Sequence, residues 1–302
     1  MDGPWCGDDV AAIKGKGRSL VVKVDMLVER TDVPSGMSYR QAARKAVAAC
    51  VSDFAAKGVA PLSFLASVGV KRGTSRQEAA ELGKGFRDAE KEWDVDLVGG
   101  DTNETEQLII DCAMFGWGNR VVGRRGAVPG ELLVVTGKFG LPPAGLKILA
   151  GRTKVKGDFE RKAVRSVLEP TPNLGAGLAA AKFLTSSMDS SDGLARSLHT
   201  LAGAGGVGFE LTKLPVANGV REYSEGNHLD AERLVLEGGE EYLVVGTLKE
   251  GDYPKAEKAV SRAGGDLIPI GVVTPKAREV TLRTKGRTRK IRDAGWTHLR
   301  GR

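Results

Sequence analysis

Several Asp residues lie at the expected ends of strands and helices, most of them with Gly or Ser close by, where carboxylates can meet above a sheet edge: Asp8, Asp9, Asp25, Asp53, Asp101, Asp189 and Asp192. The 302-residue chain has only three His and three Cys. Many carboxylates with few His or Cys form the ligand set of hard, oxygen-binding cations, above all Mg²⁺. Mg²⁺ held by few carboxylates completes its shell with water and phosphate oxygens. These residue types therefore indicate a magnesium–polyphosphate site, although an isolated Asp beside Gly is more often a turn residue or a helix cap.

Other familiar catalytic patterns are missing from the sequence. It has no HExxH, no GxSxG and no GxxxxGK[ST], which argues against a zinc protease, a serine hydrolase and a P-loop nucleotidase. The segment Gly203–Gly208 fits GxGxxG, but an expected helix precedes it and an expected strand follows it. A dinucleotide-binding fingerprint needs the reverse order, so we interpret this segment as a helix C-cap and turn.

Charge and cysteine usage narrow the class of protein. The net charge is +7, but residues 276–302 alone carry ten Lys or Arg against two Asp or Glu, which leaves −1 for the rest. A uniform nucleic-acid-binding surface is therefore disfavoured, and no nucleic-acid partner is expected. No apolar run approaches the ~20 residues of a membrane helix, and no leader segment is expected. Cys6, Cys50 and Cys112 form no CxxC pair, so we expect reduced thiols and a cytoplasmic location.

The elements that must position these carboxylates alternate between strands and helices. In the first half we expect strands at Ser19–Asp25, Leu62–Val70 and Leu108–Gly116, and helices at Ser38–Lys57 and Ser75–Trp93. Each helix opens with a capping box, formed by Ser38 with Gln41 and by Ser75 with Glu78. The breaker-rich, basic segment Gly123–Gly130 predicts a boundary between an N-terminal domain, 1–123, and a C-terminal domain, 124–302.

The second half continues the alternation and ends in a hairpin. We expect strands at Leu132–Thr136, Thr185–Ser190, Val207–Leu211, Glu240–Thr247, Leu267–Val273, Val280–Thr284 and Arg287–Arg292, the last two joined at Lys285–Gly286. We expect helices at Pro143–Ala150, Asp158–Leu168, Pro172–Leu184, Asp192–Leu201 and Pro254–Ala263. Arg124 either clamps a phosphate or belongs to a solvated linker pair with Arg125.

In order, seven short motifs resemble those of the thiamine-monophosphate kinase family. They are Gly7–Ala11 (GDDVA), Val24–Val28 (VDMLV), Val51–Gly58 (VSDFAAKG), Gly99–Thr102 (GGDT), Arg124–Gly130 (RRGAVPG), Asp189–Leu194 (DSSDGL) and Gly238–Tyr242 (GGEEY). The stretch Asp25–Met37 is similar to the archaeal branch of that family. Each motif is weak alone, but seven in the right order across nearly the whole chain are specific.

The resemblance implies an α+β fold of two domains, like that of aminoimidazole ribonucleotide synthetase, with mixed sheets and flanking helices. It also implies a homodimer formed through the N-terminal domains, with ATP bound between the domains near the dimer interface. The implied reaction is ATP plus thiamine phosphate giving ADP plus thiamine diphosphate, with several Mg²⁺ ions. A K⁺ requirement stays open.

By position, the resemblance also assigns roles to individual residues. The Mg²⁺ ligands would be Asp9, Asp25, Asp53, Asp101 and Asp189, with Asp192 on a further ion. The residues in contact with ATP would be Gly100, Asp101, Arg124 and Ser191. Asp101 and Asp189 would be catalytic, and Glu240 would face the thiamine portion. Asp32 stands where the family commonly has a substrate-facing His, and Lys23–Val24 replaces a metal-binding Ser or Thr.

Three alternatives remain at this stage. The same fold could serve a hydrogenase-maturation dehydratase, but that enzyme would carry a Cys near its C-terminus, where this chain ends Leu299–Arg302. It could serve a selenophosphate synthetase, for which Cys6 is a faint match without the Lys-bearing loop. From a different class, the basic tail could bind nucleic acid without any enzymatic activity.

Overall fold

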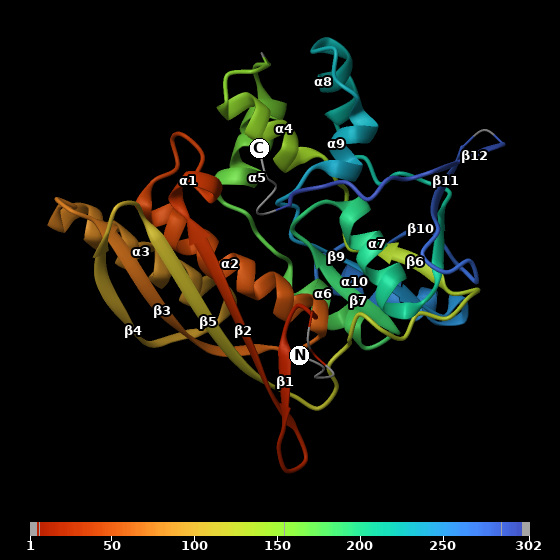
Figure 1. The fold of residues 1–302 in the computed structure, drawn as a ribbon, viewed down its shortest axis with the longest axis horizontal. Coiled ribbons are helices and arrows are strands. Elements are labelled where there is room, and N and C mark those ends of the chain that lie inside the picture. The colour runs from red at the N-terminus through yellow and green to blue at the C-terminus, as the bar shows by residue number, and fades with distance from the viewer. Residues whose placement is uncertain (1–4, 6, 154, 285, 298–302) are drawn as a thin grey trace.

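The computed structural model describes residue 5 and residues 7–153, 155–284 and 286–297. The predictions that concern Cys6, Lys285 and residues 298–302 therefore lie outside the described residues. Within them the chain forms two mixed sheets with flanking helices, which confirms the expected α+β fold (Figure 1). Strands of the first sheet lie between residues 11 and 118, and those of the second between 132 and 290. The division into domains 1–123 and 124–302 stays a prediction.

The N-terminal sheet has the strand order β1-β2-β5-β3-β4. Its strands are β1 (Ala11–Lys14), β2 (Ser19–Val28), β3 (Pro61–Lys71), β4 (Asp96–Thr105) and β5 (Ile109–Gly118). Neighbouring strands are antiparallel except β3 and β4, which are parallel. A short helix, α1 (Glu29–Asp32), follows β2. The strands β1 and β4 were not expected from the sequence.

Two long helices cover one face of this sheet, α2 (Tyr39–Lys57) and α3 (Arg76–Trp93) (Figure 1). Both capping boxes are confirmed, since Ser38 and Ser75 cap the helices and the side chains three residues later bond back to the cap backbone. Ala and Val repeat along the buried side of α2, and they pack with Phe54, Phe64 and Met114 into the N-terminal core.

The C-terminal sheet has the order β12-β11-β8-β10-β6-β9-β7. Its strands are β6 (Leu132–Val135), β7 (Ser186–Ser190), β8 (Gly208–Leu211), β9 (Leu243–Leu248), β10 (Ile268–Thr274), β11 (Val280–Thr284) and β12 (Arg287–Lys290). Its helices are α4 (Leu141–Leu149), α5 (Asp158–Leu168), α6 (Leu174–Ala181), α7 (Leu194–Gly205), α8 (Val220–Gly226), α9 (Ala231–Glu237) and α10 (Tyr253–Arg262), with a 3₁₀ turn at Glu250–Asp252. The sequence analysis missed α8 and α9.

Several expected boundaries in this half differ from the structure by two or more residues, and two of them have a cause in local backbone geometry. The strand expected from Glu240 begins only at Leu243, since Glu240 and Tyr242 have φ angles of 66° and 50° that an extended strand does not allow. The helix expected from Asp192 begins at Leu194, because Gly193 has φ 112°. The interpretation of the GxGxxG-like segment is confirmed, since α7 ends in it and Gly206 is a left-handed C-cap.

Helix α2 joins the two halves of the molecule. Its C-terminal turns pack against α6 and β7 of the second half. The helices α2 and α6 approach closely because Gly177 has no side chain; a Cβ there would lie 2.6 Å from the backbone oxygen of Ala55. Residues near the C-terminal end of α2 are therefore held next to β7. No helix in the described part of the chain is long and apolar enough to cross a membrane.

Candidate active site

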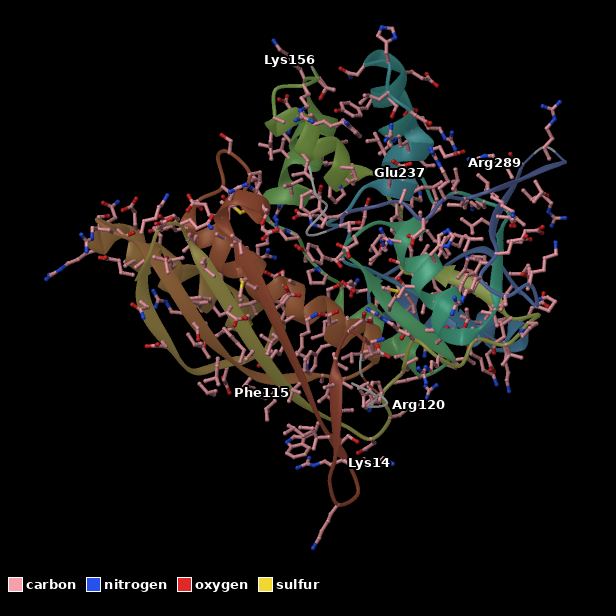
Figure 2. The ribbon with its side chains drawn as sticks, viewed as in Figure 1. Lys14, Phe115, Arg120, Lys156, Glu237 and Arg289 are labelled. Atoms are coloured by element: carbon pink, nitrogen blue, oxygen red, sulfur yellow. The ribbon has the colours of Figure 1, made fainter. Side chains whose placement is uncertain are left out.

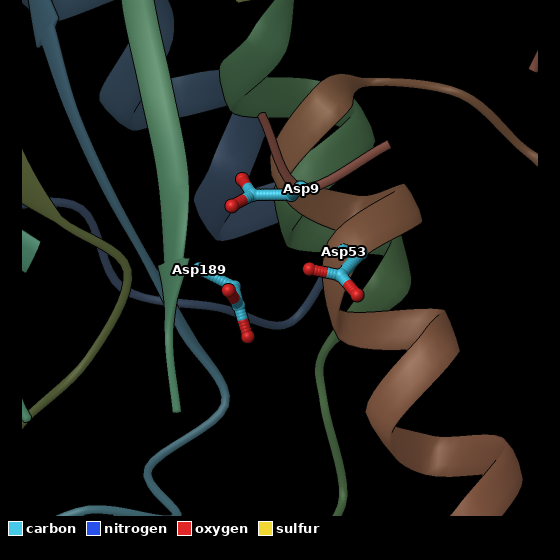
Figure 3. A group of neighbouring side chains, drawn as sticks. All are labelled: Asp9, Asp53 and Asp189. Carbon is cyan, nitrogen blue, oxygen red and sulfur yellow. The ribbon is translucent and has the colours of Figure 1, made fainter. Parts of the chain in front are cut away.

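Three buried carboxylates meet where the two halves join (Figure 3). Asp9 precedes β1, Asp53 lies on α2, and Asp189 lies on β7. One oxygen of each lies within 4.8 Å of the others. Three acidic groups in such proximity repel one another unless cations share the space. The contact of α2 with β7 is what brings residues separated by more than 130 positions together.

Two cations, the buried Lys57 and the half-buried Arg124, hold Asp9. Lys57 Nζ lies 2.8 Å from Asp9 Oδ2 and 2.6 Å from Asp8 Oδ1, and it donates to the Ser187 carbonyl at 2.6 Å. The guanidinium of Arg124 donates to Asp9 Oδ1 from Nε at 3.1 Å and also from a second nitrogen. Burial alone would raise the pKa of Asp9, but Lys57 and Arg124 lower it below its ordinary value, so this carboxylate is ionised at neutral pH.

A third cation, Lys23, enters the cluster from β2. Its Nζ lies 2.7 Å from Asp53 Oδ2 and 3.4 Å from Asp25 Oδ2. Burial opposes the charge of Lys23, but the neighbouring carboxylates of Asp53 and Asp25 raise its pKa, so the ammonium stays protonated. Asp25 is thereby tied to the same cluster, and it also lines the cavity that the cluster faces.

The other two carboxylates are hard to ionise. Burial, together with the charge of Asp189, raises the pKa of Asp53 well above its ordinary range. Burial, together with the charge of Asp9, raises the pKa of Asp189 to about 7, against a hydrogen bond of 3.0 Å that Ser52 Oγ donates. A further cation at this point would let both groups ionise. A buried, oxygen-only donor set of this kind fits Mg²⁺.

The cluster opens into two adjoining cavities. The smaller, of about 270 Å³, is lined by Asp8, Asp9, Lys23, Asp53, Arg124 and Asp189 among others. The larger, of about 560 Å³, is lined by Asp32, Lys45, Glu240 and Trp296 among others. Asp25, Ser191, Asp192 and Tyr242 line both. Figure 2 shows side chains filling the space between the ribbons of the two halves, and it labels Glu237, at the end of α9, which lines the larger cavity.

An ion pair fixes the wall of the larger cavity. Lys45 of α2 is 1% exposed, and its Nζ donates to both oxygens of Glu240, at 2.6 and 2.8 Å, and to the Asp32 carbonyl at 2.7 Å. The Asp32 carboxylate accepts from the backbone N–H of Val28 at 2.8 Å and from Thr31 at 2.9 Å. Asp32 thus stabilises the turn of α1 while lining the cavity.

Backbone hydrogen bonds hold Glu240 against the segment Ser190–Ser191, which directly follows Asp189. Its N–H donates to the Ser191 carbonyl at 2.6 Å, and the Tyr242 N–H donates to the Ser190 carbonyl at 3.1 Å. A Cβ on Gly239 would lie 2.6 Å from the Ser191 oxygen, so a residue with a side chain would not fit there. The Gly-Gly-Glu segment and the Asp-Ser-Ser-Asp-Gly segment therefore form one unit.

Glu241 lies between Glu240 and Tyr242, which both have left-handed backbones, and its carboxylate accepts the Gly140 N–H at 2.5 Å. Burial raises the pKa of Glu241 to about 8, against that hydrogen bond. Because the folded pKa is above the ordinary 4.5, the contribution of this group to stability is fully present below pH 4.5 and is lost as pH rises through about 8.

Replacing Glu241 with Gln keeps an acceptor for Gly140 but removes the ionisation. We expect the variant to gain roughly 1–4 kcal/mol of unfolding free energy over the parent protein between pH 5 and pH 9. Denaturant unfolding at both pH values measures this gain. A stability difference that does not change with pH would contradict it.

Of the predicted site residues, Gly100 and Asp101 lie apart from the cluster. Both belong to β4, the edge strand, and line a separate shallow hollow. The row Asp101–Ser67–Asp111–Met26 runs across the sheet, so three strand spacings of ~4.8 Å separate Asp101 from β2. Gly100 has a structural reason to be Gly, since a Cβ would lie 1.9 Å from the Ala66 oxygen. Within one chain, these two residues do not reach the cluster.

The sequence analysis missed the buried lysines Lys45 and Lys57, and it treated Lys23 only as a departure from a family pattern. Both Lys45 and Lys57 stand on the apolar, core-facing side of α2, where a charged residue needs a partner. That position was the available signal. Their acidic partners come from distant segments, so no local pattern could identify them.

Comparisons with known proteins match the whole chain. Residues 7–118 match the family described as AIR synthase related protein, N-terminal domain. A thiamine-monophosphate kinase of Nitrosopumilus maritimus is 36% identical over 97% of this chain and 93% of its own length, and one of Pyrococcus horikoshii is 33% identical over 100% and 93%. A solved structure described as AaThiL complexed with AMPPCP and TMP superposes with a TM-score of 0.89 at 27% identity, covering 98% of this chain and 93% of that one. Structures of the hydrogenase maturation protein HypE, such as that of E. coli (20% identity, TM-score 0.75), share the fold.

Proposed function

Since the chain belongs to the thiamine-monophosphate kinase family, we propose that it transfers the γ-phosphoryl group of ATP directly to thiamine phosphate, giving ADP and thiamine diphosphate. The observation that carries the proposal is the buried carboxylate cluster, which lines a cavity of about 270 Å³ that shares wall residues with one of about 560 Å³. The relative solved with AMPPCP and TMP supports the same pair of substrates. The hydrogenase-maturation alternative has support only at the level of the fold.

The donor set fits Mg²⁺, which when bound neutralises phosphate charge and aligns the reacting groups. Asp9, Asp53 and Asp189 would hold it, with Asp25 and Asp192 at the rim of the cavity. Arg124 is anchored on Asp9 beside these carboxylates, so its guanidinium is positioned to meet an ATP phosphate. Whether K⁺ is also required is tested in the assay below.

Transfer in one step suits the residues that line the cavities. A phosphate monoester has its second pKa near ~6, so the attacking oxygen is already anionic at neutral pH and needs no general base. Among the described residues, neither cavity is lined by His or Cys. The protein's contribution is therefore to orient two phosphates in line and to exclude water. No phosphorylated enzyme intermediate is expected.

The larger cavity would take the thiamine portion. The Glu240 carboxylate, held by Lys45, offers a negative charge for the positively charged thiazolium ring. Trp296 adds an aromatic wall, and its backbone N–H donates to the Asp192 carbonyl at 3.0 Å, which fixes Trp296 at the cavity. Asp32 lines the same cavity.

Replacing Asp32 with Ala should raise the KM for thiamine phosphate at least ~5-fold and the KM for ATP much less, because a lost contact that discriminates substrates costs ~1–3 kcal/mol. Steady-state kinetics with each substrate varied measures the two values. Asp32→Asn is the matched control for the turn, since an amide oxygen can still accept from Val28 and Thr31. Equal changes in both KM values would exclude Asp32 from the thiamine pocket.

We also propose that the active protein is a homodimer joined through the uncovered face of the N-terminal sheet. That face exposes Ile13, Val24, Met26, Leu62, Leu65, Val98 and Trp117, an apolar surface that monomers rarely leave in water. On the same face, Asp111 has a buried Oδ1 with no hydrogen-bond partner among the described residues. Asp101 lies in the row of Asp111, so a second copy is what would give Asp101 and Gly100 a role near ATP.

The test is a product assay. The purified protein is incubated with ATP, Mg²⁺ and thiamine phosphate, with and without K⁺, and thiamine diphosphate is quantified by chromatography. We expect product that disappears when EDTA is added. ATP binding by calorimetry without any product would support the nucleotide site and reject thiamine phosphate as the acceptor.

A cytoplasmic location accords with the use of ATP and with the free thiols of Cys50 and Cys112.

A further inference from the structure

Fixed cations occupy two sides of the carboxylate cluster. On one side, Lys57 and Arg124 contact Asp9 and Asp8. Elsewhere in the cluster, Lys23 contacts Asp53 and Asp25. The five carboxylates Asp8, Asp9, Asp25, Asp53 and Asp189 thus face three built-in positive charges.

The two lysines of the cluster differ in their exposure to the cavity. Lys57 is fully buried and also donates to a backbone carbonyl, so it belongs to the packing between α2 and β7. Lys23 keeps 20% of its side chain exposed and lines the smaller cavity itself. Its ammonium therefore stands in the space where ligands of the carboxylates would be placed.

We propose that the Lys23 ammonium is a built-in cation that takes the place of one divalent ion on the Asp25–Asp53 side of the site. This inference rests on the proposed function, because it assumes that the cluster holds divalent ions for phosphoryl transfer. An ammonium 2.7 Å from Asp53 Oδ2 keeps that oxygen from a metal ion, which would need to approach to ~2.1 Å. The +1 charge also repels any divalent ion within a few ångströms.

The position left for a divalent ion is then beside Asp189 and the Asp53 oxygen that Lys23 does not contact. Asp189 receives a hydrogen bond from Ser52, and no ion pair with a Lys or Arg is described for it. Asp9 belongs to the same group of ligand atoms within 4.8 Å of one another, but Lys57 and Arg124 already contact both of its oxygens. The Asp189 carboxylate and Asp53 Oδ1 are therefore the acceptors left for a divalent ion. Lys23 thereby fixes how many ions the empty enzyme binds and where they bind.

Replacing Lys23 with Met removes the charge while keeping much of the side chain's length. We expect the Lys23→Met variant to bind one more Mn²⁺ per chain than the parent protein in the absence of nucleotide, measured by calorimetry and by the electron paramagnetic resonance signal of free Mn²⁺. Lys23→Arg should bind the parent's number, because it restores the charge. Lys71→Met is the matched control, since Lys71 pairs with Glu29 at 2.7 Å outside both cavities of the site.

An unchanged Mn²⁺ number in Lys23→Met would overturn the proposal. So would a lower number, which would mean that Lys23 organises the site instead of filling it. A larger rise in melting temperature on adding Mn²⁺ to Lys23→Met than to the parent would support it, because the added ion replaces the lost charge.

A second measurement needs no variant. In crystals of the parent protein grown with Mn²⁺, the anomalous signal should lie beside Asp189, with Lys23 still in contact with Asp53. A Mn²⁺ ion bonded to Asp53 Oδ2, with Lys23 displaced, would overturn the proposal even if Lys23→Met did not fold.

These readouts separate the inference from the proposed function. They use neither ATP nor thiamine phosphate, so a protein that makes no thiamine diphosphate can still gain an ion in Lys23→Met. Equal and non-zero Mn²⁺ numbers in parent and variant would overturn the role of Lys23 alone. No Mn²⁺ binding to any of the proteins would overturn both this inference and the metal part of the proposed function.

Discussion

Replacing Asp189 with Asn should lower the formation of thiamine diphosphate at least ~100-fold, the scale of losing one charge-stabilising catalytic group. The same substitution should stabilise the metal-free protein at pH 8. Both effects arise from the position of Asp189, which is buried among other carboxylates where a cation is needed. Activity assays and thermal unfolding in EDTA measure the two effects on the same preparation.

The sign of the stability change follows from the pKa of Asp189. Its folded value, about 7, is above the ordinary 3.8, so the favourable contribution of this group is complete below pH 3.8 and is lost as pH rises through about 7. Asn cannot ionise, so the advantage of Asp189→Asn should grow by roughly 1–4 kcal/mol between pH 4 and pH 8. Adding Mg²⁺ should stabilise the parent protein and not the variant.

Asp158→Asn is the control for a carboxylate outside the site. Asp158 is exposed on α5, where a hydrogen bond and the charge of Lys162 lower its pKa, so its loss should bring no stabilisation at pH 8 and no loss of activity. An Asp189→Asn variant that keeps near-normal activity would remove Asp189 from the catalytic site. Loss of activity together with loss of stability would mean that the cluster is a structural ion-pair network.

How much of the fold the sequence could predict depends on how local each signal is. Each capping box, at Ser38 and at Ser75, involves only four consecutive residues, so the sequence shows it directly. Both helices begin where the sequence predicts. The strand β4, with two Gly and two Thr around Asp101, has no apolar alternation. It forms because β3 provides a parallel partner along its length, and that partner lies more than 30 residues away in the sequence.

The candidate site was predictable in its residue types and not in its charge balance. Acidic residues beside small residues indicated Mg²⁺, and the order of the motifs indicated which carboxylates to choose. Whether Asp9, Asp53 and Asp189 meet depends on the packing of α2 against β7, which a sequence pattern does not specify. The counter-charge of Lys57 depends on the packing of α2 against β7, and that of Lys23 depends on the packing of α2 against β2, so neither was predicted.

Asp101 lies too far from the carboxylate cluster of its own chain to act in it. Its motif indicates a role near ATP, yet its strand lies at the edge of the sheet, away from the carboxylate cluster. The apolar face that it shares with Val24 and Leu65 gives the physical reason to expect a second copy. The role near ATP that the Asp101 motif indicates is compatible with its place at the sheet edge only if two chains form the site.

Replacing Val24 with Lys should therefore convert the proposed dimer into a monomer. Val24 is 62% exposed in the single chain, so the substitution costs the folded monomer little. In a symmetric dimer it would bury two unpaired charges in an apolar interface, at several kcal/mol each, which weakens association at least ~100-fold. Light scattering after size-exclusion chromatography measures the mass, and the kinase assay measures the activity of the monomer.

Val128→Lys is the matched control, because Val128 is 55% exposed but lies in the link between the two sheets, outside the N-terminal sheet. It should leave both mass and activity unchanged. A Val24→Lys protein that stays dimeric would place the interface elsewhere. A monomer with full activity would mean that the face carrying Asp101 adds nothing to the site; a monomer that loses activity while its melting temperature is retained would mean that each ATP site needs both chains.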